Sequence, residues 1–270
     1  KFPPMNILVL IKQVPESQAT RMDESTGTIV REAANSVINP LDLHALECAL
    51  ILREQSDTTV NLDCLSMGPP AAVSVLKEAI ALGADQGYLL SDRKFAGSDT
   101  WCTARTLAAA IAKIGSYDLI LCGERATDGE TGQTGPALAA MLDLPVLTYA
   151  SAISRSAGGW RVRRMLEDGY ETVETTGPAV VCVLKEASVP RLPTLAGKRR
   201  ARAASCRVID AAELGIDPAD TGLNASPTRV VSIFRPNHLK HSERLSALDP
   251  AGVERAVEKI IAIFRQKGVL

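Results

Sequence analysis

Short apolar runs alternate with segments of helical apolar spacing over the first two thirds of this 270-residue chain. The runs are continuously apolar instead of alternating with polar residues, which is typical of strands buried on both faces. Such strand–helix alternation predicts a doubly wound α/β fold, a mostly parallel sheet with helices on both sides. The predicted strands are residues 6–12, 60–67, 86–90, 118–122 (expected to be central), 146–149 and 180–184, and the predicted helices are residues 40–55, 71–83, 98–115 (with Ser98 as N-cap) and a segment ending near 142.

Ligands of a doubly wound sheet bind beyond the carboxyl ends of its strands. The loops after Lys12, Met67 and Cys122 should therefore meet at one edge of the sheet. The third loop, residues 123–135, is glycine-rich and opens a helix, where backbone N–H groups and the helix dipole attract a phosphate. It matches neither G-x-G-x-x-G nor a P-loop, and a nucleotide site and an ordinary long loop both remain open. Three acids in it must point away from a phosphate or accept from a ribose hydroxyl: Glu124, Asp128 and Glu130.

The pattern changes in the second half of the chain. Residues 161–166 and 170–174 alternate polar and apolar positions around Glu167-Asp168-Gly169, which predicts a β-hairpin. Regular structure thins out after Lys185, and a long stretch of this kind is more typical of an arm that lies on something else. We therefore divide the chain into a nucleotide-binding α/β domain, residues 5–185, and a C-terminal arm, residues 186–270.

The arm is expected to end in a helix. Asp249 is its predicted N-cap, Pro250 occupies the first helical position and Gly268 lies past its end. One apolar stripe runs along it, formed by Val253, Val257, Ile260, Ile261 and Phe264. The stripe suits docking either on the core of this chain or on a partner chain, and both interpretations remain open.

Basic residues gather in one short window. Residues 198–207 hold five basic residues and no acid, although the formal net charge of the whole chain is −1. A nucleic-acid interface is not indicated, because no aromatic residues interleave these charges. Leu192 and Leu195 precede the window in a proline-framed loop. Apolar anchors beside a basic rim are better suited to docking onto a protein.

Composition excludes several classes of function. The six cysteines lie at least sixteen residues apart, so zinc and iron–sulfur sites, whose ligands are closely spaced, are not supported. We expect reduced thiols of a cytoplasmic protein. No apolar run is long enough to insert into a membrane, and the near-neutral charge argues against a nucleic-acid partner. No nucleophile–base pair or phosphoryl-transfer motif is visible, so catalysis is not indicated.

Four segments of the chain resemble the beta (small) subunit of electron transfer flavoproteins. They are residues 7–15 (ILVLIKQVP), residues 39–42 (NPLD) with 81–85 (ALGAD), residues 122–136, and the pattern Val162-x-Arg164-x-x-Glu167-Asp168-Gly169-x-Glu171-x-Val173 followed by Pro178-x-Val180-Val181-Cys182. The fourth is the most specific, since many positions recur at fixed gaps. The resemblance extends from residue 7 to about residue 236, with a similar terminal helix.

This resemblance implies a domain of the adenine-nucleotide-binding type, with an added β-hairpin and an extended C-terminal arm that embraces a larger alpha subunit. It implies an electron carrier whose alpha subunit holds most of the FAD, while the beta subunit binds AMP. The implied AMP contacts are Leu10, Asn39, Pro40, Leu41, Asp42, Met67, Gly123, Glu124, Arg125, Ala126, Thr127, Asp128, Gly129, Glu130, Thr131, Gly132, Gln133 and Thr134. The implied docking partner is a flavin-containing dehydrogenase such as an acyl-CoA dehydrogenase, contacted by Arg191, Leu192, Leu195, Lys198, Arg199 and Arg200.

Departures from the family pattern leave alternatives open. Family members often carry a tyrosine after the arginine of the docking loop and an unbroken lysine-rich run, where this chain has Leu192 and Ala196-Gly197-Lys198. The identity of the docking partner therefore stays open. Residues 226–231 with Phe234 resemble bacterial members, some of which hold a second FAD in the AMP site and split electrons from NADH. The alternatives are an AMP-binding carrier subunit, a bifurcating subunit with a second FAD, and, more remotely, a nucleotide-binding regulatory module.

Overall fold

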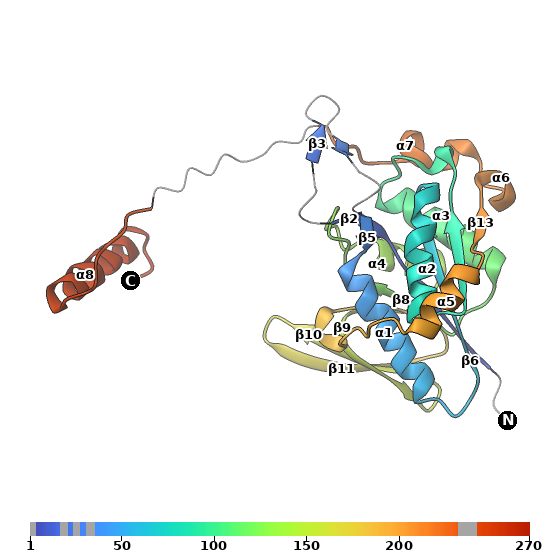
Figure 1. Cartoon of the computed structure of the whole chain (residues 1–270), viewed down its shortest axis with the longest axis horizontal. Coiled ribbons are helices and arrows are strands. Elements are labelled where there is room, and N and C mark those ends of the chain that lie inside the picture. Colours follow the sequence, from blue (N-terminus) through green and yellow to red (C-terminus); the bar gives the residue numbers. More distant parts are fainter. Residues whose placement is uncertain (1–3, 17–20, 24–27, 31–35, 232–241) are drawn as a thin grey trace. The chain divides into compact units, whose positions relative to one another are not determined.

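The computed structural model of the chain describes residues 4–16, 21–23, 28–30, 36–231 and 242–270. They belong to two compact units, Lys1–Val231 and Ser232–Leu270. A nine-stranded sheet runs through the first unit in the order β11-β10-β9-β12-β8-β1-β6-β7-β13 (Figure 1). Seven of its strands are joined by parallel pairing: β1 (Met5–Leu10), β6 (Val60–Met67), β7 (Gln86–Leu90), β8 (Leu119–Gly123), β9 (Val146–Ser156), β12 (Ala179–Val183) and β13 (Arg207–Ile209). The predicted doubly wound, mostly parallel sheet is confirmed, and β8, buried at all five positions, lies at its centre.

Helices cover both faces of this sheet. They are α1 (Pro40–Glu54), α2 (Val73–Leu82), α3 (Thr100–Ile114) and α4 (Thr134–Met141), with short 3-10 turns η2 (Pro70–Ala72) and η3 (Arg93–Phe95). Successive residues of a strand point to opposite faces, so Ile7 joins the core under α1 and α2, while Leu8 joins the core under α3 and α4. The N-cap of α3 is Asp99, not the predicted Ser98: the Asp99 carboxylate accepts from the Cys102 N–H at 3.0 Å.

The predicted hairpin extends the sheet at one edge. β10 (Gly159–Leu166) pairs antiparallel with β11 (Gly169–Thr176) and with β9. β9 continues beyond its predicted end because β10 offers it a second pairing partner. Trp160 of β10 is buried, and its indole N–H donates to the Asp118 carbonyl at 3.0 Å, which ties the hairpin to the central part of the sheet.

The stretch from 186 to 231 is less irregular than its composition suggested. It contains η4 (Lys185–Ala187), α5 (Leu195–Ala203), α6 (Ala211–Leu214), η5 (Pro218–Asp220), α7 (Gly222–Ala225) and the outermost strand β13. The basic window begins in α5, which packs against α2 so closely that a Cβ on Gly197 would lie 2.1 Å from the Ala81 carbonyl oxygen. Arg200 also donates to the Ile80 carbonyl at 2.7 Å, at the end of α2. The division after residue 185 stays a prediction.

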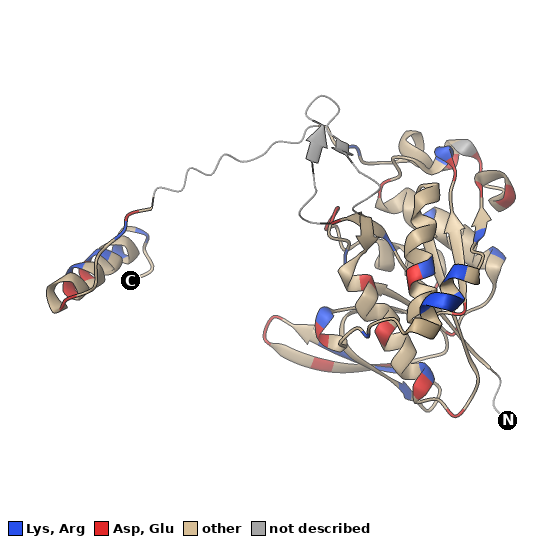
Figure 2. Ribbon diagram, in the orientation of Figure 1, with Lys and Arg blue, Asp and Glu red and all other residues tan. Residues whose placement is uncertain are grey.

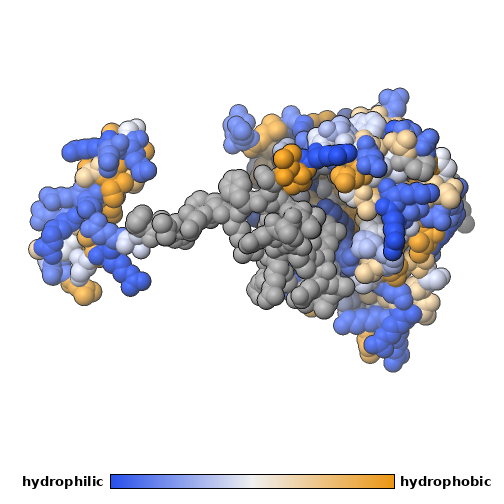
Figure 3. Space-filling model, turned by 90° about the horizontal axis from the view of Figure 1, so that it is seen from above, coloured by the Kyte–Doolittle hydropathy of each residue, from blue (hydrophilic) through white to orange (hydrophobic). Residues whose placement is uncertain are grey.

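Two small antiparallel pairs and one helix complete the described elements. The pairs are β2 (Gln13–Pro15) with β5 (Ser36–Ile38) and β3 (Arg21–Asp23) with β4 (Thr28–Val30). The second unit contains α8 (Pro250–Gln266), and the predicted cap is confirmed, since the Asp249 carboxylate accepts from the Gly252 N–H at 2.6 Å. Within this unit hydrophobic and hydrophilic residues interleave on the surface (Figure 3), and the exposed apolar side chains include Val253, Val257, Ile260, Ile263 and Phe264.

Candidate nucleotide site and docking segment

The strand order reverses between β1 and β8. From β1 the chain continues to β6 and β7 on one side, and β8 with β12 lies on the other. The carboxyl ends of two such strands diverge into loops on opposite faces and leave a crevice for a ligand. The glycine-rich loop follows β8 directly, so the structure places it at this reversal point.

Asn39 fastens this loop to the start of α1. Its side-chain Nδ2 donates to the Arg125 carbonyl at 2.9 Å, and its Oδ1 accepts from the Thr127 N–H at 3.2 Å. Asn39 precedes Pro40 at the N-cap position, yet its side chain makes no capping hydrogen bond to its own helix. A residue type that ordinarily caps a helix here shapes the neighbouring loop.

Asp42, one turn further along α1, ties together three chain segments. Its carboxylate accepts from the Lys12 N–H at 2.8 Å, after β1, and from the Gly123 N–H at 3.0 Å, at the end of β8. The side chain is buried, and that burial raises its pKa to about 6. The two backbone N–H donors, the Asn39 side chain and the charge of Lys12 all act in the opposite direction and lower it. A buried carboxylate with partners on both strands holds the two loop origins together.

Two of the three acids of the loop are paired with basic residues, and Glu130 is exposed. Lys12 Nζ lies 2.7 Å from Asp128 Oδ1, and the Asp128 side chain is only 6% exposed. Glu124 pairs with its neighbour Arg125 at 3.2 Å. Lys12 is a site residue that the sequence analysis did not single out, although its place directly after a buried strand was a usable signal.

A hollow of about 140 Å³ adjoins the loop on the side of β9 and β12. Two of its lining residues, Glu130 and Tyr149, have the left-handed φ values of 51° and 56°, and the β9–β12 register shifts next to Tyr149. Bulges and left-handed non-glycine residues cluster at functional sites because the surrounding structure must hold them. The lining residues are Glu124, Arg125, Glu130, Thr131, Gly132, Thr148, Tyr149 and Cys182. No local sequence signal marked Thr148 or Tyr149, and Cys182 appeared only as part of the family pattern.

The structure brings the predicted loop contacts together, and Leu10 ends β1 beside the end of β8, since Val9 pairs with Leu121. Residues 39–42 and 123–128 are joined by the hydrogen bonds given above, whereas Leu10 and Met67 belong to the core beneath α3 and α4. Leu10 and Met67 as nucleotide contacts, with the rest of the AMP set, stay predictions. Phe234 lies outside the described residues.

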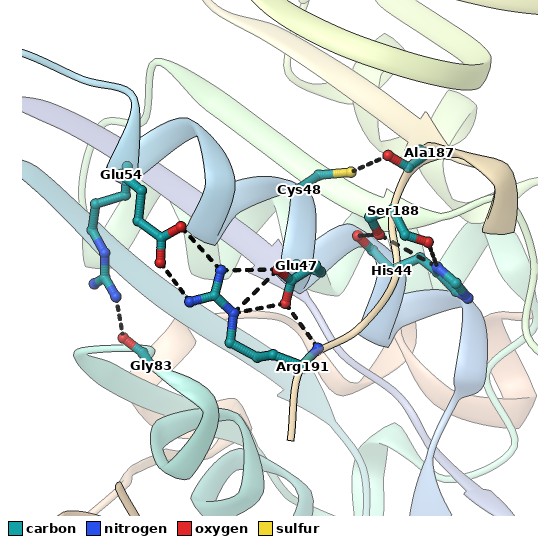
Figure 4. A network of polar contacts seen from close by, with 9 residues as sticks. His44, Glu47, Cys48, Glu54, Gly83, Ala187, Ser188 and Arg191 are labelled. Carbon is teal, nitrogen blue, oxygen red and sulfur yellow. Dashed lines mark hydrogen bonds and ion pairs between the residues drawn. The ribbon is translucent and has the colours of Figure 1, made fainter. Parts of the chain in front are cut away.

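The predicted docking residues lie in one segment: Arg191 and Leu192 precede α5, and Leu195, Lys198, Arg199 and Arg200 belong to it. Leu192 and Leu195 are 88% and 70% exposed, and Lys198 and Arg199 project from α5 into solvent. Figure 2 shows the basic residues of α5 beside α2. Arg191, in contrast, is engaged with two glutamates of α1 (Figure 4).

Among the described residues, no cluster of three or more His, Cys, Asp or Glu could hold a metal ion. All six cysteines are free, and all but Cys206 are buried. In the part of the chain that the structure describes, no helix has the length and apolarity needed to cross a bilayer.

Replacing Asp42 by asparagine is expected to remove one titration from the folding equilibrium. The folded-state pKa of Asp42, about 6, lies above its ordinary value of 3.8. The folded state therefore takes up this proton first. The corresponding stability is fully present below about pH 4 and is lost as the pH rises through 6. The free energy of unfolding of the native protein minus that of Asp42→Asn should fall by about 2 kcal/mol between pH 4 and pH 7. Urea unfolding followed by the fluorescence of buried Trp160 measures it, and a pH-independent difference would contradict the assignment.

The family model of the electron transfer flavoprotein domain matches residues 26–214 of the chain. The chain is 41% identical to electron transfer flavoprotein subunit beta of Thermoanaerobacterium thermosaccharolyticum, over 98% of this chain and 100% of that protein. It is 42% identical to the caffeyl-CoA reductase-Etf complex subunit CarD of Acetobacterium woodii, over 86% and 88%. It is 39% identical to the acryloyl-CoA reductase electron transfer subunit gamma of Anaerotignum propionicum, over 95% and 98%.

Proposed function

The chain belongs to the electron transfer flavoprotein family, as a beta subunit, and from this premise we propose that it binds AMP and passes electrons from a flavin-containing dehydrogenase to an FAD held mainly by an alpha subunit. In such a heterodimer this chain supplies a nucleotide site and a docking segment. The FAD supplies the redox chemistry. The residues of this chain bind and orient the nucleotide and dock onto the dehydrogenase.

The observation that carries the nucleotide proposal is the junction of α1 with the loop at the strand-order reversal. Asn39 and Asp42 hold the backbone of residues 123–127 in place. The first turn of α4 has no side-chain cap, since the Gln133 side chain instead accepts from Thr100 at 3.1 Å. Uncapped N–H groups at a helix start favour a phosphate. Pairing of Asp128 with Lys12 removes one negative charge that would repel it.

The docking proposal is supported by exposed apolar side chains beside a basic helix. Leu192 and Leu195 expose most of their surface, and α5 adds Lys198 and Arg199 next to them. Leucine anchors bury well in a pocket of a partner, and a basic rim raises the association rate with an acidic surface. A flavin-containing dehydrogenase, such as an acyl-CoA dehydrogenase, is the proposed partner. The six free thiols support a reducing compartment, the cytoplasm.

A second candidate is a bifurcating beta subunit that holds a second FAD in the same site and oxidises NADH. A second hollow of about 440 Å³ also borders Gly132 and is lined in part by Trp101 and Pro227. It offers room for a ligand larger than AMP. Two relatives bear names of subunits in CoA-ester reductase assemblies, which also favours this candidate. A self-contained regulatory module is disfavoured, because it has no use for an exposed docking segment.

Counting the cofactors of the purified heterodimer tests these proposals. Acid extraction followed by chromatography should release one FAD and one AMP per heterodimer, because the site is shaped by backbone groups suited to one phosphate. Two FAD and no AMP would replace the carrier by the bifurcating subunit. A stable colourless monomer that co-purifies with no flavin-bearing chain would contradict both and leave the regulatory module.

A further inference from the structure

The guanidinium and the backbone N–H of Arg191 donate hydrogen bonds to two glutamates of α1. Nε donates to the Glu47 carboxylate at 2.9 and 3.1 Å, and Nη2 donates to Glu47 Oε1 at 2.9 Å and to Glu54 Oε2 at 3.2 Å. Nη1 donates to Glu54 Oε1 at 2.5 Å. The backbone N–H of Arg191 adds a bond to Glu47 Oε2 at 3.1 Å. Every nitrogen of the guanidinium is thus engaged within this chain (Figure 4).

The inner partner makes this contact hard to release. The Glu47 side chain is only 7% exposed, and Glu54 lies two helical turns further along the same face of α1. If Arg191 turned outward to meet another protein, it would leave a buried carboxylate without its cation, which is strongly unfavourable. The two glutamates also raise the pKa of Arg191, and Arg191 holds the pKa of Glu54 below its usual range.

The same face of α1 fastens the chain just before Arg191. His44 Nδ1 lies 2.9 Å from the Ser188 carbonyl oxygen, and the Ser188 hydroxyl donates to the His44 carbonyl at 3.0 Å. Cys48 Sγ lies 4.0 Å from the Ala187 carbonyl oxygen. Between and after these contacts, Val189 and Leu192 are 87% and 88% exposed. Ser188 and Arg191 therefore face α1, whereas Val189 and Leu192 face solvent.

We propose that Arg191 is a positioning residue, which clamps residues 187–191 onto α1 so that Leu192 and Leu195 are presented to the docking partner. It does not itself contact that partner. The inference rests on the proposed docking function and assigns to Arg191 a different role from the one that its family resemblance implied. α1 thereby carries the nucleotide loop at its start and the docking segment along its length.

A double-mutant cycle with Arg191→Met and Glu47→Leu in the intact heterodimer tests this proposal. Each single change should raise the KM of the dehydrogenase for the heterodimer about tenfold and change kcat less than twofold, because the segment is loosened and the FAD is untouched. The double variant should be no worse than either single one. Arg191→Lys should remain impaired, since one ammonium cannot span both carboxylates. Two results would overturn the proposal and show that Arg191 contacts the partner. One is that Arg191→Met raises KM by the same factor in the Glu47→Leu background as in the native protein, and the other is that Arg191→Lys has the KM of the native protein.

Arg199→Met is the control variant. This exposed arginine is proposed to contact the partner directly and takes no part in clamping residues 187–191 onto α1. Its effect on KM should weaken with salt and should multiply with that of Glu47→Leu.

Amide hydrogen exchange is a second measurement of the clamp, and it needs no partner protein. Arg191→Met and Glu47→Leu should speed exchange of residues 187–192 and leave α3 unchanged. Unchanged exchange in residues 187–192 overturns the clamp even if no dehydrogenase reduces this protein. If both core variants fail to fold, Glu54→Gln, on the exposed side of the pair, should speed the same exchange about threefold, and no change there overturns it equally.

Discussion

Replacing Gly123 by alanine is expected to empty the nucleotide site and to lower the free energy of unfolding by about 2 to 3 kcal/mol. A Cβ at this position would lie 2.7 Å from Asp42 Oδ1, 2.7 Å from the Cβ of Leu41 and 2.8 Å from the backbone carbonyl carbon of Leu41. The first turn of α1 would have to retreat, since helix backbone cannot yield as the end of a flexible side chain can. Retreat would also stretch the Gly123 N–H bond to Asp42.

Nucleotide released per heterodimer and the urea unfolding midpoint measure this effect. Gly158→Ala, in the turn between β9 and β10, is the control, because a Cβ there would meet nothing within 4 Å and its φ needs no glycine. The control should keep both its nucleotide and its midpoint. Full nucleotide content in Gly123→Ala would show that the ligand does not depend on the junction of α1 with the loop, and the proposed site would have to move.

Replacing Leu195 by alanine is expected to raise the KM of the partner dehydrogenase about thirtyfold, the equivalent of about 2 kcal/mol for an anchor buried at an interface. The side chain is 70% exposed in the free chain, so little packing is lost when it is shortened. The start of α5 should survive, because the Thr194 hydroxyl, which accepts from the Gly197 N–H at 3.0 Å, is unchanged. Flavin content should equal that of the native heterodimer.

Steady-state reduction of the heterodimer by the dehydrogenase is the measurement. Val208→Ala serves as control, since Val208 is 52% exposed on the outermost strand β13 and lies outside the docking segment. Its KM should be that of the native protein. Equal KM values for Leu195→Ala and the native heterodimer would remove Leu195 from the docking surface.

The sheet and its covering helices could be predicted because their signals are local. Continuous apolar runs and helical spacing depend on a residue and its near neighbours, so β6 and β7 begin and end where the sequence predicts. The predicted bounds of strands are wrong where pairing with a distant part of the chain sets them. β9 is extended by its pairing with β10, and β13 forms only because β7 offers an edge. The cap of α3 is the exception, since Ser98 and Asp99 are adjacent and locally equivalent.

The candidate site divides in the same way. Its location after β8 follows from strand order, which periodicity reveals, and the residues of the loop are recognisable as they stand. Its internal contacts do not follow. Nothing near Lys12 indicates that it meets Asp128, 116 residues away, and Arg191 resembles a docking charge until Glu47, 144 residues away, is seen to hold it.

The sequence by itself determined the fold class, the family and the edge of the sheet at which a ligand should bind, because hydrophobic period and motif spacing are written along the chain. The tertiary structure alone decided which polar groups are spent inside the molecule and which remain for a ligand or a partner. Hydrogen bonds and ion pairs depend on atoms within a few ångströms, and folding sets those distances between residues that are far apart in sequence. Asn39 is thereby turned from a helix cap into a loop anchor, and Leu192 and Leu195 are left outward.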